Sequence, residues 1–345
     1  MKITFNKKNE ELLYPITLTR EGEDIFCAGF TLKEILAVSI KSKINIDISI
    51  PSTTIPSISN MNKIQTFLNL GESGEVNNLD EFKFPHDIIL WHKRLSKENL
   101  KLKSTFKKYK EIRKGIFIAS NVKISQFALL DSTRGPIIID NDSRVEHFTT
   151  IYGPCYIGEG NLIKDHAKIV NLCSEKSCEL GGEIDSCVFL RFSSKQHYGF
   201  LGESFIGSWV NIGAGSTNSD LKNTYGNIKV VDGKNNPVDT GEQFLGCVIG
   251  DYSKISICSR IYTGKIIGVN SFVYEKVISN IPSFVNYTQF IDIKNSEFRL
   301  DKSLEIQRKI FSRRGKEPLE FDTEILKHAF EITQINRNKF LNQKV

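Results

Sequence analysis

Aliphatic residues recur at every sixth position through the middle of the chain. A helix would place apolar residues every three or four positions and a strand every two, so neither element explains a period of six. The period fits short strands joined by sharp turns, three to a triangular coil, with each aliphatic side chain stacking inside the prism on the next coil. The uninterrupted series is Ile139, Val145, Ile151, Ile157, Ile163 and Ile169. A β-sandwich with chance spacing is the alternative, and so long a series argues against it. We therefore predict a left-handed parallel β-helix of hexapeptide repeats.

This β-helix is expected from about Ile118 to about Phe272, with roughly seven coils. Its phase is interrupted near Leu180-Gly181, and the inward positions are expected to resume at Val188 and to continue with Ser194, Phe200, Ile206 and Ile212. A second interruption covers residues 217–244, which are rich in Asn, Asp, Gly and Lys, before the phase returns at Ile249, Ile255, Ile261 and Ile267. We interpret both interruptions as loops that leave the prism. A long polar loop on a rigid scaffold is a common place for function.

The flanks lack the repeat. Residues 1–110 mix helix and strand patterns, which predicts a small α/β domain before a β-helical unit at 111–285. A helix is expected from Phe30 to Lys41, where a threonine N-cap and a glutamate three residues later fit a capping box. Alternating isoleucines predict a strand from Ile44 to Ile50, and a charged helix is expected from Ser96 to Tyr109.

Residues 286–345 are expected to form a helical tail. Ser303 to Arg313 carries apolar residues on one side and ends before a glycine, as helices often do. A second helix is expected to start at Asp322 or Thr323. These helices are expected either to cap the open end of the prism or to pack on a neighbouring subunit. The fold class is therefore mainly β, with a small α/β domain before the β-helix and helices after it.

Composition and charge narrow the class of protein. The chain has 46 Lys and Arg against 40 Asp and Glu, and this mild excess does not require a nucleic-acid partner. Seven cysteines, an odd number without a CxxC pair, indicate reduced thiols in a cytoplasmic protein. The amino terminus lacks the apolar core of a signal peptide, and no run approaches about 18 apolar residues, so no membrane partner is expected. His147, His166 and Asp185 follow one another at nineteen-residue spacing, but this set is one histidine short of a three-histidine zinc site, so no metal is expected.

One segment resembles a known family. Residues Ser193 to Asn223 read SSKQHYGFLGESFIGSWVNIGAGSTNSDLKN. This resembles the acetyltransferase half of the bifunctional, GlmU-like enzyme that makes UDP-N-acetylglucosamine. In that family a lysine and a histidine precede a tyrosine–leucine–glycine–acid turn, and a VNIGAG coil and an Asn-rich loop follow. The resemblance implies acyl transfer from acetyl-CoA to an amino-sugar phosphate or sugar nucleotide, by a homotrimer with sites between neighbouring prisms.

A shorter branch of sugar nucleotidyltransferases of this type is similar over most of the chain. The matching segments are Tyr14 to Arg20, Gly181 to Glu183, Ser194 to His197, Phe298 to Lys302 and Arg313 to Gly315. A working nucleotidyltransferase has a Gly-rich loop after its first strand, where backbone N–H groups hold phosphates. Here Asn6-Lys7-Lys8-Asn9 follows the first strand, and the first glycine is Gly22. The N-terminal region is therefore expected to be a shortened nucleotidyltransferase-like domain without nucleotidyl transfer.

Acyl transfer needs a base for the attacking amine or hydroxyl and donors for the oxyanion. His197 is the expected base, because imidazole titrates near neutral pH and His197 stands at the family's catalytic position. A structural loop histidine is the alternative. Arg191 and Lys195 are expected to bind a sugar phosphate, although solvated surface charges are equally consistent with the sequence.

The resemblance implies further ligands. Lys168 replaces the family's phosphate-binding arginine, and Phe200 replaces its tyrosine. Asp220 falls at the asparagine that holds the acetyl group, with Asn218 close by. Asn211 is expected to contact the acceptor sugar, unless it belongs to an asparagine ladder. The expected CoA-binding residues are Gly213, Ala214 and Gly215 along the pantetheine arm and Lys222 and Lys229 at the phosphates.

Two other functions remain open at this point. A sugar-1-phosphate nucleotidyltransferase would release pyrophosphate, and the missing Gly-rich loop argues against it. A non-catalytic sugar-nucleotide-binding scaffold would show no affinity for CoA and would tolerate the loss of His197.

Overall fold

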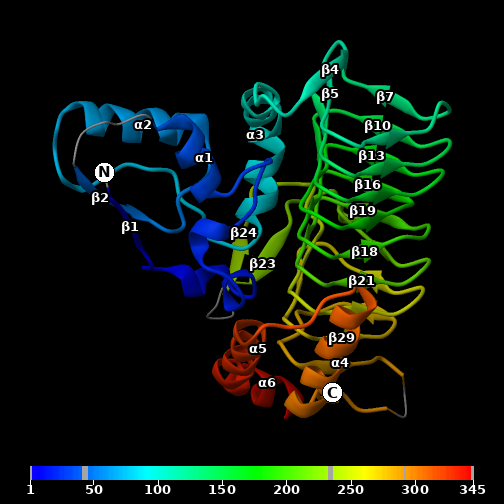
Figure 1. The fold of residues 1–345 in the computed structure, drawn as a ribbon. Coiled ribbons are helices and arrows are strands. Elements are labelled where there is room, and N and C mark those ends of the chain that lie inside the picture. Colours follow the sequence, from blue (N-terminus) through cyan, green and yellow to red (C-terminus); the bar gives the residue numbers. More distant parts are fainter. Residues whose placement is uncertain (1, 41–45, 232–235, 291–292, 343–345) are drawn as a thin grey trace.

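The computed structural model describes residues 2–40, 46–231, 236–290 and 293–342. It is mainly β, and its centre is a left-handed parallel β-helix of about nine turns. A small α/β domain lies beside this prism, and the C-terminal helices lie across its far end (Figure 1). The predicted fold class is confirmed, although the count of coils is higher than the predicted seven. The repeat extends beyond Phe272, because β31 continues the ladder one step further.

The prism has three faces. The first face contains β4 (Lys110–Arg113), β5 (Ile116–Ile118), β8 (Ile137–Ile139), β11 (Cys155–Ile157), β14 (Cys173–Ser174), β17 (Val188–Phe189), β20 (Phe205–Ile206), β25 (Cys247–Ile249) and β28 (Lys265–Ile267). The second contains β6 (Lys123–Ile124), β9 (Arg144–Val145), β12 (Leu162–Ile163), β15 (Glu179–Leu180), β18 (Ser194–Lys195), β21 (Asn211–Ile212), β26 (Lys254–Ile255), β29 (Phe272–Val273), β31 (Val285–Tyr287) and β32 (Ser296–Glu297). The third face has two ladders in succession. The first contains β7 (Leu129–Asp131), β10 (Thr150–Tyr152), β13 (Lys168–Val170), β16 (Glu183–Asp185) and β19 (Phe200–Gly202), and the second contains β22 (Thr217–Asn218), β27 (Arg260–Ile261) and β30 (Lys276–Val277).

The predicted inward stack is present before and after the interruptions. The residues from Ile139 to Ile169 that recur at every sixth position are buried in one core cluster, together with Ile206, Ile212, Ile249, Ile255, Ile261 and Ile267. Apart from the antiparallel pairs β4–β5 and β31–β32 at the two ends, the ladders on the three faces are parallel, so each aliphatic side chain packs on its counterpart one coil away. Burial of this continuous stack stabilises the prism, since no single coil can bury its own apolar side.

The first interruption is a shortened coil, not the predicted loop. Leu162 pairs with Glu179 and Glu179 with Ser194, which are steps of 17 and 15 residues. Against the 18-residue coil from Arg144 to Leu162, these steps are one and three residues short, and the inward residues before Ile206 stand one position after the predicted ones. Phe189, Lys195 and Leu201 therefore point inward. The predicted inward residues Val188, Ser194 and Phe200 were wrong, and they point away from the prism axis.

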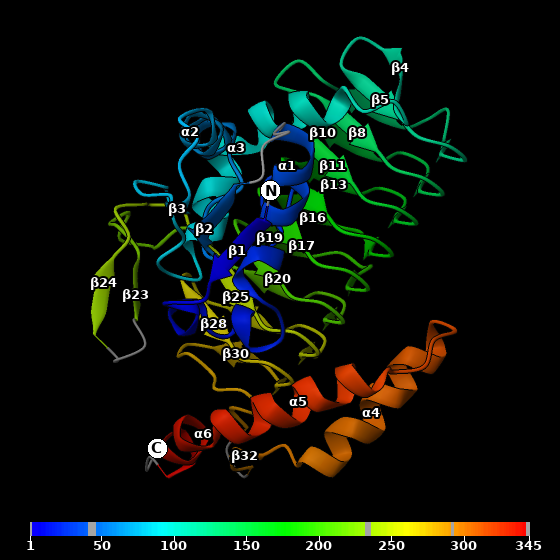
Figure 2. The same ribbon diagram turned by 60° about the vertical axis from the view of Figure 1, so that its left-hand side comes forward.

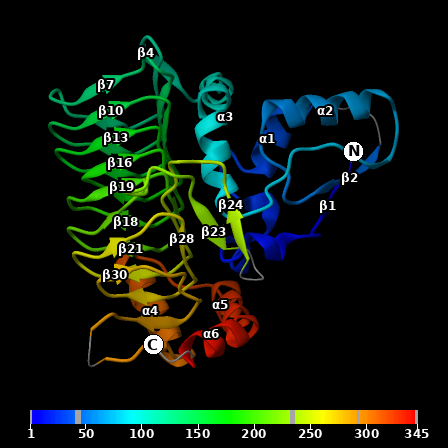
Figure 3. The same cartoon turned by 180° about the vertical axis from the view of Figure 1, so that it is seen from behind.

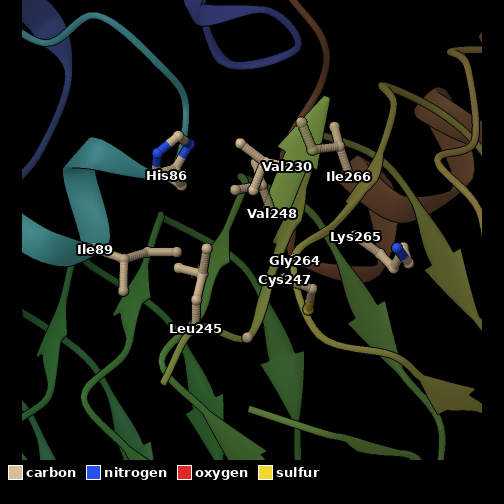
Figure 4. A pocket seen from close by; sticks show the side chains of 10 residues that line it. His86, Ile89, Val230, Leu245, Cys247, Val248, Gly264, Lys265 and Ile266 are labelled. Carbon is tan, nitrogen blue, oxygen red and sulfur yellow. The ribbon is translucent and has the colours of Figure 1, made fainter. Parts of the chain in front are cut away.

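The second interruption is a true excursion, but it starts later than predicted. Thr217 and Asn218 form β22 and pair with β27, so they belong to the prism. The chain then leaves the prism, forms the hairpin of β23 (Lys229–Val231) and β24 (Pro237–Asp239), and returns at β25. Figure 3 shows this hairpin beside β28 of the prism. Val230 and Leu245 pack there beside Ile89 around a small apolar hollow (Figure 4).

The N-terminal region is the predicted small α/β domain. Its parallel sheet has the order β1 (Lys2–Asn6), β2 (Asp47–Pro51) and β3 (Gly74–Glu75), and its helices are α1 (Leu32–Ser39), α2 (Ile58–Asn69) and α3 (Asp87–Ser104). The predicted capping box of α1 is confirmed, because Thr31 and Glu34 bond to each other's backbone N–H groups. Helix α3 begins nine residues before the predicted Ser96. Residues 44 and 45 of the predicted strand lie outside the described residues. That this domain derives from a nucleotidyltransferase stays a prediction.

Helix α3 fixes the domain on the first face. It lies against β8 and β11, and the small sheet stands outside it (Figure 2). The imidazole of His92 is fully buried, with Nε2 2.8 Å from the Asn171 carbonyl oxygen and Nδ1 3.0 Å from the Ser96 hydroxyl. Tyr156 of β11 packs on Phe26 of the domain. The first face is thus covered, whereas the second and third faces carry the candidate site.

The C-terminal tail is helical, as predicted. It contains α4 (Leu300–Arg313), α5 (Glu320–Ile332) and α6 (Gln334–Leu341). Phe311 of α4 stacks on Trp209 with ring centroids 4.2 Å apart, and Phe340 of α6 packs on the prism core near Tyr287. These contacts support the first predicted role, which is capping of the open end. Among the described helices, none has the length and apolar character needed to cross a membrane.

Candidate functional site

His197 lies on the turn that joins the second face to the third face. We call the line formed by these turns, one per coil, the His197 corner. The side chain of His197 is exposed, and the turn runs from β18 directly into β19. Gly213, Ala214 and Gly215 form the same turn one coil further on, where the N–H of Gly215 donates to the carbonyl oxygen of Tyr198 at 3.0 Å. The base and the pantetheine-binding turn predicted from the sequence are therefore neighbours.

Glycines allow this corner to pack tightly. Gly182 lies one coil before His197 with φ +72°, and a Cβ atom there would lie 2.7 Å from both the His197 carbonyl oxygen and the Lys195 Nζ. Gly199 has φ +122°, and a Cβ atom there would clash with the backbone of Ser216. Any larger residue at either position would displace the backbone on which His197 stands.

Lys195 points into the prism. Its side chain is 1% exposed, and Nζ donates to the carbonyl oxygens of Gly181 at 2.9 Å and His197 at 2.8 Å. Burial lowers the pKa of Lys195 to about 8, because an ammonium ion loses solvation inside the prism. The predicted sugar-phosphate ligand thus lies behind the turn, with its charge directed away from the surface.

Three predicted residues meet on the third face. Lys168 and Phe200 lie in one ladder on either side of Glu183, and Lys168 pairs with Glu183 at 2.9 Å. The Phe200 ring covers Gly202, where no Cβ atom would fit. Asp220 lies beside the same glycine, so its carboxylate is close to the Phe200 ring. Burial raises the pKa of Asp220, and the negative charge of Asp185 acts in the same direction.

Asn218 is structural in this arrangement. It occupies an inward position and is 4% exposed. Its Oδ1 accepts from the Gly202 N–H at 2.8 Å, and its Nδ2 donates to the Gly202 carbonyl oxygen at 2.9 Å. The Asn218 side-chain amide therefore makes the hydrogen bonds to Gly202 that a neighbouring strand would otherwise make. Shortly after this residue the chain leaves the prism.

Four predicted ligands do not converge on His197 within one chain. Arg191 lies between β17 and β18, at the corner that joins the first face to the second. Asn211 is exposed on the second face and pairs in register with Ser194. Lys222 and Lys229 lie in the excursion, where Lys222 Nζ donates to the Asn227 carbonyl oxygen at 3.1 Å. Their roles in binding stay predictions.

Two contacts near the site have no local signal in the sequence. Lys93 of α3 pairs at 2.8 Å with Glu203, the acidic residue of the resembling turn. Burial raises the pKa of Glu203 to about 7, and the charge of Lys93 opposes that rise. Arg314 Nη1 lies 2.7 Å from Glu179, and Glu179 in turn accepts from Gln196 Nε2 at 2.6 Å. The N-terminal domain and the C-terminal tail thus both contact the segment that carries His197.

Carboxylates that could hold a metal ion lie elsewhere. Among the described residues, oxygens of Glu10, Glu21 and Glu23 lie within 4.8 Å of one another in the N-terminal domain. Lys7 pairs with Glu21, and Lys33 lies 3.5 Å from Glu23, so lysines already compensate part of this charge.

The histidines that the sequence singled out as a weak zinc set are engaged with neighbours at the His197 corner. His147 Nδ1 lies 2.7 Å from the Ser125 hydroxyl, and His166 stacks on Phe148 with ring centroids 5.2 Å apart.

Comparison with known proteins identifies relatives of part of the chain. No protein-family profile matches it. It is 29% identical over 161 residues to the bifunctional protein GlmU of Thermotoga petrophila, a match that covers 46% of this chain and 29% of that protein. It is 29% identical over 185 residues to a bifunctional sugar-1-phosphate nucleotidylyltransferase/acetyltransferase of Sulfurisphaera tokodaii, covering 51% of this chain and 42% of that protein. The chain thus spans less than half the length of these curated relatives.

Solved structures include β-helical transferases with little sequence similarity. An N-acyltransferase AntD from Bacillus cereus, solved with dTDP-4-amino-4,6-dideoxyglucose and coenzyme A, is 15% identical. The match covers 63% of this chain and 97% of that one, with a TM-score of 0.23. The repeat and the prism make this chain a hexapeptide-repeat left-handed β-helix protein, and the matched part of it is similar to GlmU and to a sugar-1-phosphate nucleotidylyltransferase/acetyltransferase.

Proposed function

We propose that the protein is an acyl-CoA-dependent acyltransferase that acetylates an amino-sugar phosphate or a sugar nucleotide, with His197 as the general base. The observation that carries this proposal is the exposed His197 one coil before the Gly213–Gly215 turn. This pair supplies a base next to a turn of small residues, along which we expect an extended thioester arm to lie. The name of the Sulfurisphaera relative, which includes an acetyltransferase, supports the reaction class.

The reaction moves one proton from the attacking nitrogen to the leaving sulfur, in two transfers through His197. The acceptor amine attacks the carbonyl carbon of the acetyl thioester, so that a C–N bond forms and the C–S bond then breaks. His197 takes the proton that the attacking nitrogen loses and returns a proton to the CoA sulfur as it leaves. Asp220 and Phe200 lie on the third face beside this turn, where they would contact the acceptor and the acetyl group.

The proposed active form is a homotrimer. Phe148, Tyr198 and Ile257 are more than half exposed along the His197 corner, so large apolar side chains gather on this line. A neighbouring prism on this corner would cover them and could bring Arg191, Asn211, Lys222 or Lys229 of another subunit towards His197. Light scattering should then give three times the mass of the chain, and Phe148→Glu should reduce that mass to that of a monomer.

A panel of candidate acceptor substrates identifies the acceptor. The chain is mixed with acetyl-CoA and one amino sugar, amino-sugar 1-phosphate or amino-sugar nucleotide at a time, and free CoA is measured. Mass spectrometry of the product shows whether an acetyl group was added, and mild base distinguishes an ester from an amide. Absence of CoA release with every acceptor, together with absence of acetyl-CoA binding, would overturn the proposal in favour of a binding protein.

Nucleotidyl transfer is not proposed. After β1 the chain passes through Asn6 to Asn9 into a short 3-10 helix at Glu10–Leu13 without a glycine. This loop therefore lacks the Gly-rich backbone whose N–H groups would hold a triphosphate. Release of pyrophosphate from a nucleoside triphosphate and a sugar 1-phosphate would reverse this conclusion. The cytoplasm is the compartment that we propose, since the cysteines are free thiols.

A further inference from the structure

Lys195 breaks the pattern that builds the prism. Leu180 precedes it in register on the second face, and Ile212 occupies the corresponding position of the next strand. Every sixth position is otherwise mostly aliphatic, so a leucine at position 195 would continue the stack. A charged residue at an otherwise apolar core position is expected where the residue serves function at the expense of stability.

The charge of Lys195 has no acidic partner among the hydrogen bonds of the described residues. Its two acceptors are backbone carbonyl oxygens, those of Gly181 and His197. Replacing a buried charge with an apolar side chain of similar size is often neutral or stabilising. The ammonium is thus costly for folding, and its contacts indicate what it does instead.

The two acceptors lie on successive turns of the His197 corner. One hydrogen bond reaches the turn before His197, and the other reaches the peptide that directly follows the imidazole-bearing residue. The absent Cβ of Gly182 leaves room for the ammonium between the two turns. A side chain without hydrogen-bond donors could fill this space but could not connect the two backbones.

We propose that Lys195 is a positioning residue, whose ammonium holds the His197 turn in the geometry needed for proton transfer. This inference rests on the proposed function. It differs from the role predicted from the sequence, because Lys195 acts from inside the prism and does not contact a sugar phosphate.

Lys195→Met tests the proposal, since methionine keeps the length and loses the donors. The expected result is a roughly 10- to 100-fold lower kcat, since small misplacements of a catalytic group have effects of this size. The KM for acetyl-CoA should change little, and the thermal midpoint should stay equal or rise. A residue with a merely structural role would instead lower the midpoint and leave kcat unchanged in the folded fraction.

Lys254→Met is the matched control. Lys254 lies on the same face, and its Nζ also donates to a backbone carbonyl oxygen, that of Trp209 at 2.6 Å. It does not contact the His197 turn, so kcat should stay within about twofold of wild type. A wild-type kcat in Lys195→Met, or an equal loss in both variants, would overturn the proposal.

Hydrogen exchange separates this inference from the acyltransferase proposal. In Lys195→Leu the amides of residues 196–199 should exchange at least about tenfold faster, while those of Ile206 and Ile212 keep the wild-type rate. Unchanged exchange at residues 196–199 would overturn the positioning role, whatever the enzyme assay shows. Faster amide exchange at residues 196–199, in a protein that shows no acetyl transfer, would support the hydrogen bonds of Lys195 to the His197 turn. It would refute only the proposed acyl transfer.

Discussion

Lys93 and Glu203 form an ion pair of 2.8 Å between helix α3 and the turn that follows β19. The pair connects the N-terminal domain to the strand that carries Phe200, Leu201 and Gly202. Burial and the nearby negative charges of Asp220 and Asp185 raise the pKa of Glu203 to about 7, and the positive charge of Lys93 opposes this rise. The domain therefore contributes a cation to an otherwise acidic part of the third face.

This relationship predicts a pH dependence of stability. The folded pKa of Glu203 lies above its unfolded value of about 4.3, so the folded state binds more protons between pH 4.3 and 7. Through this group the free energy of unfolding should fall as pH rises across that range, by about 2 to 3 kcal/mol. Urea unfolding of wild type and Glu203→Gln at pH 5 and pH 8 measures it. An equal change in both proteins would show that Glu203 is not responsible.

His92 should change the free energy of unfolding with pH in the opposite direction. Burial lowers its folded pKa to about 4, so the unfolded state binds more protons between pH 4 and 6.5. Acidification across this range should therefore destabilise the contact between α3 and the first face, by up to about 3 kcal/mol. Urea midpoints of wild type and His92→Gln between pH 7 and pH 4.5 test this. The account fails for His92 if the variant keeps the full pH dependence.

Lys195 adds a third titration, at alkaline pH. Its folded pKa of about 8 lies below its unfolded value of about 10.4, so the ammonium is destabilising at pH 7 and this cost disappears as pH rises. Lys195→Met should therefore be more stable than wild type at pH 7, by up to about 3 kcal/mol, with the difference narrowing towards pH 10. A constant difference between the two urea curves would contradict this explanation.

The C-terminal tail should affect activity through Arg314. This side chain bonds Glu179 and the Ser194 hydroxyl, at 2.7 and 3.0 Å, and Glu179 holds Gln196 next to His197. Arg314→Ala should lower kcat roughly tenfold, because strand β18 before His197 loses its hydrogen bonds to the C-terminal tail. Arg313→Ala removes the adjacent charge without these bonds and serves as the control. Equal rates for the two variants would refute a role for the tail.

The sequence predicts most of the prism because its rule is local. Six regularly spaced residues from Ile139 to Ile169 are enough to establish the period and the inward side. The rule fails from Val188 to Phe200, where successive coils are shortened and the inward residues stand one position later than predicted. The inward residue there is Lys195, whose charge disguises the true register. Phe189 and Leu201 lie in the true register, but Val188 and Phe200 made the neighbouring register look equally apolar.

The candidate site is only partly predictable for a related reason. His197 and the Gly213–Gly215 turn belong to one continuous motif, so their proximity follows from the repeat. The pairs Lys93–Glu203 and Arg314–Glu179 join residues more than a hundred positions apart, and no local pattern marks them. Arg191 stands only six residues before His197, but the three-sided coil places the two residues on different corners.

The central claim is that His197 is the base of an acyl transfer. Its most direct test is the initial rate of CoA release from acetyl-CoA, with the best acceptor of the panel, for wild type, His197→Ala and His328→Ala. His328 lies exposed on α5 and controls for the loss of a surface imidazole. We predict a rate at least about 100-fold lower for His197→Ala and an unchanged rate for His328→Ala. A His197→Ala protein that is folded and releases CoA at the wild-type rate would contradict the account.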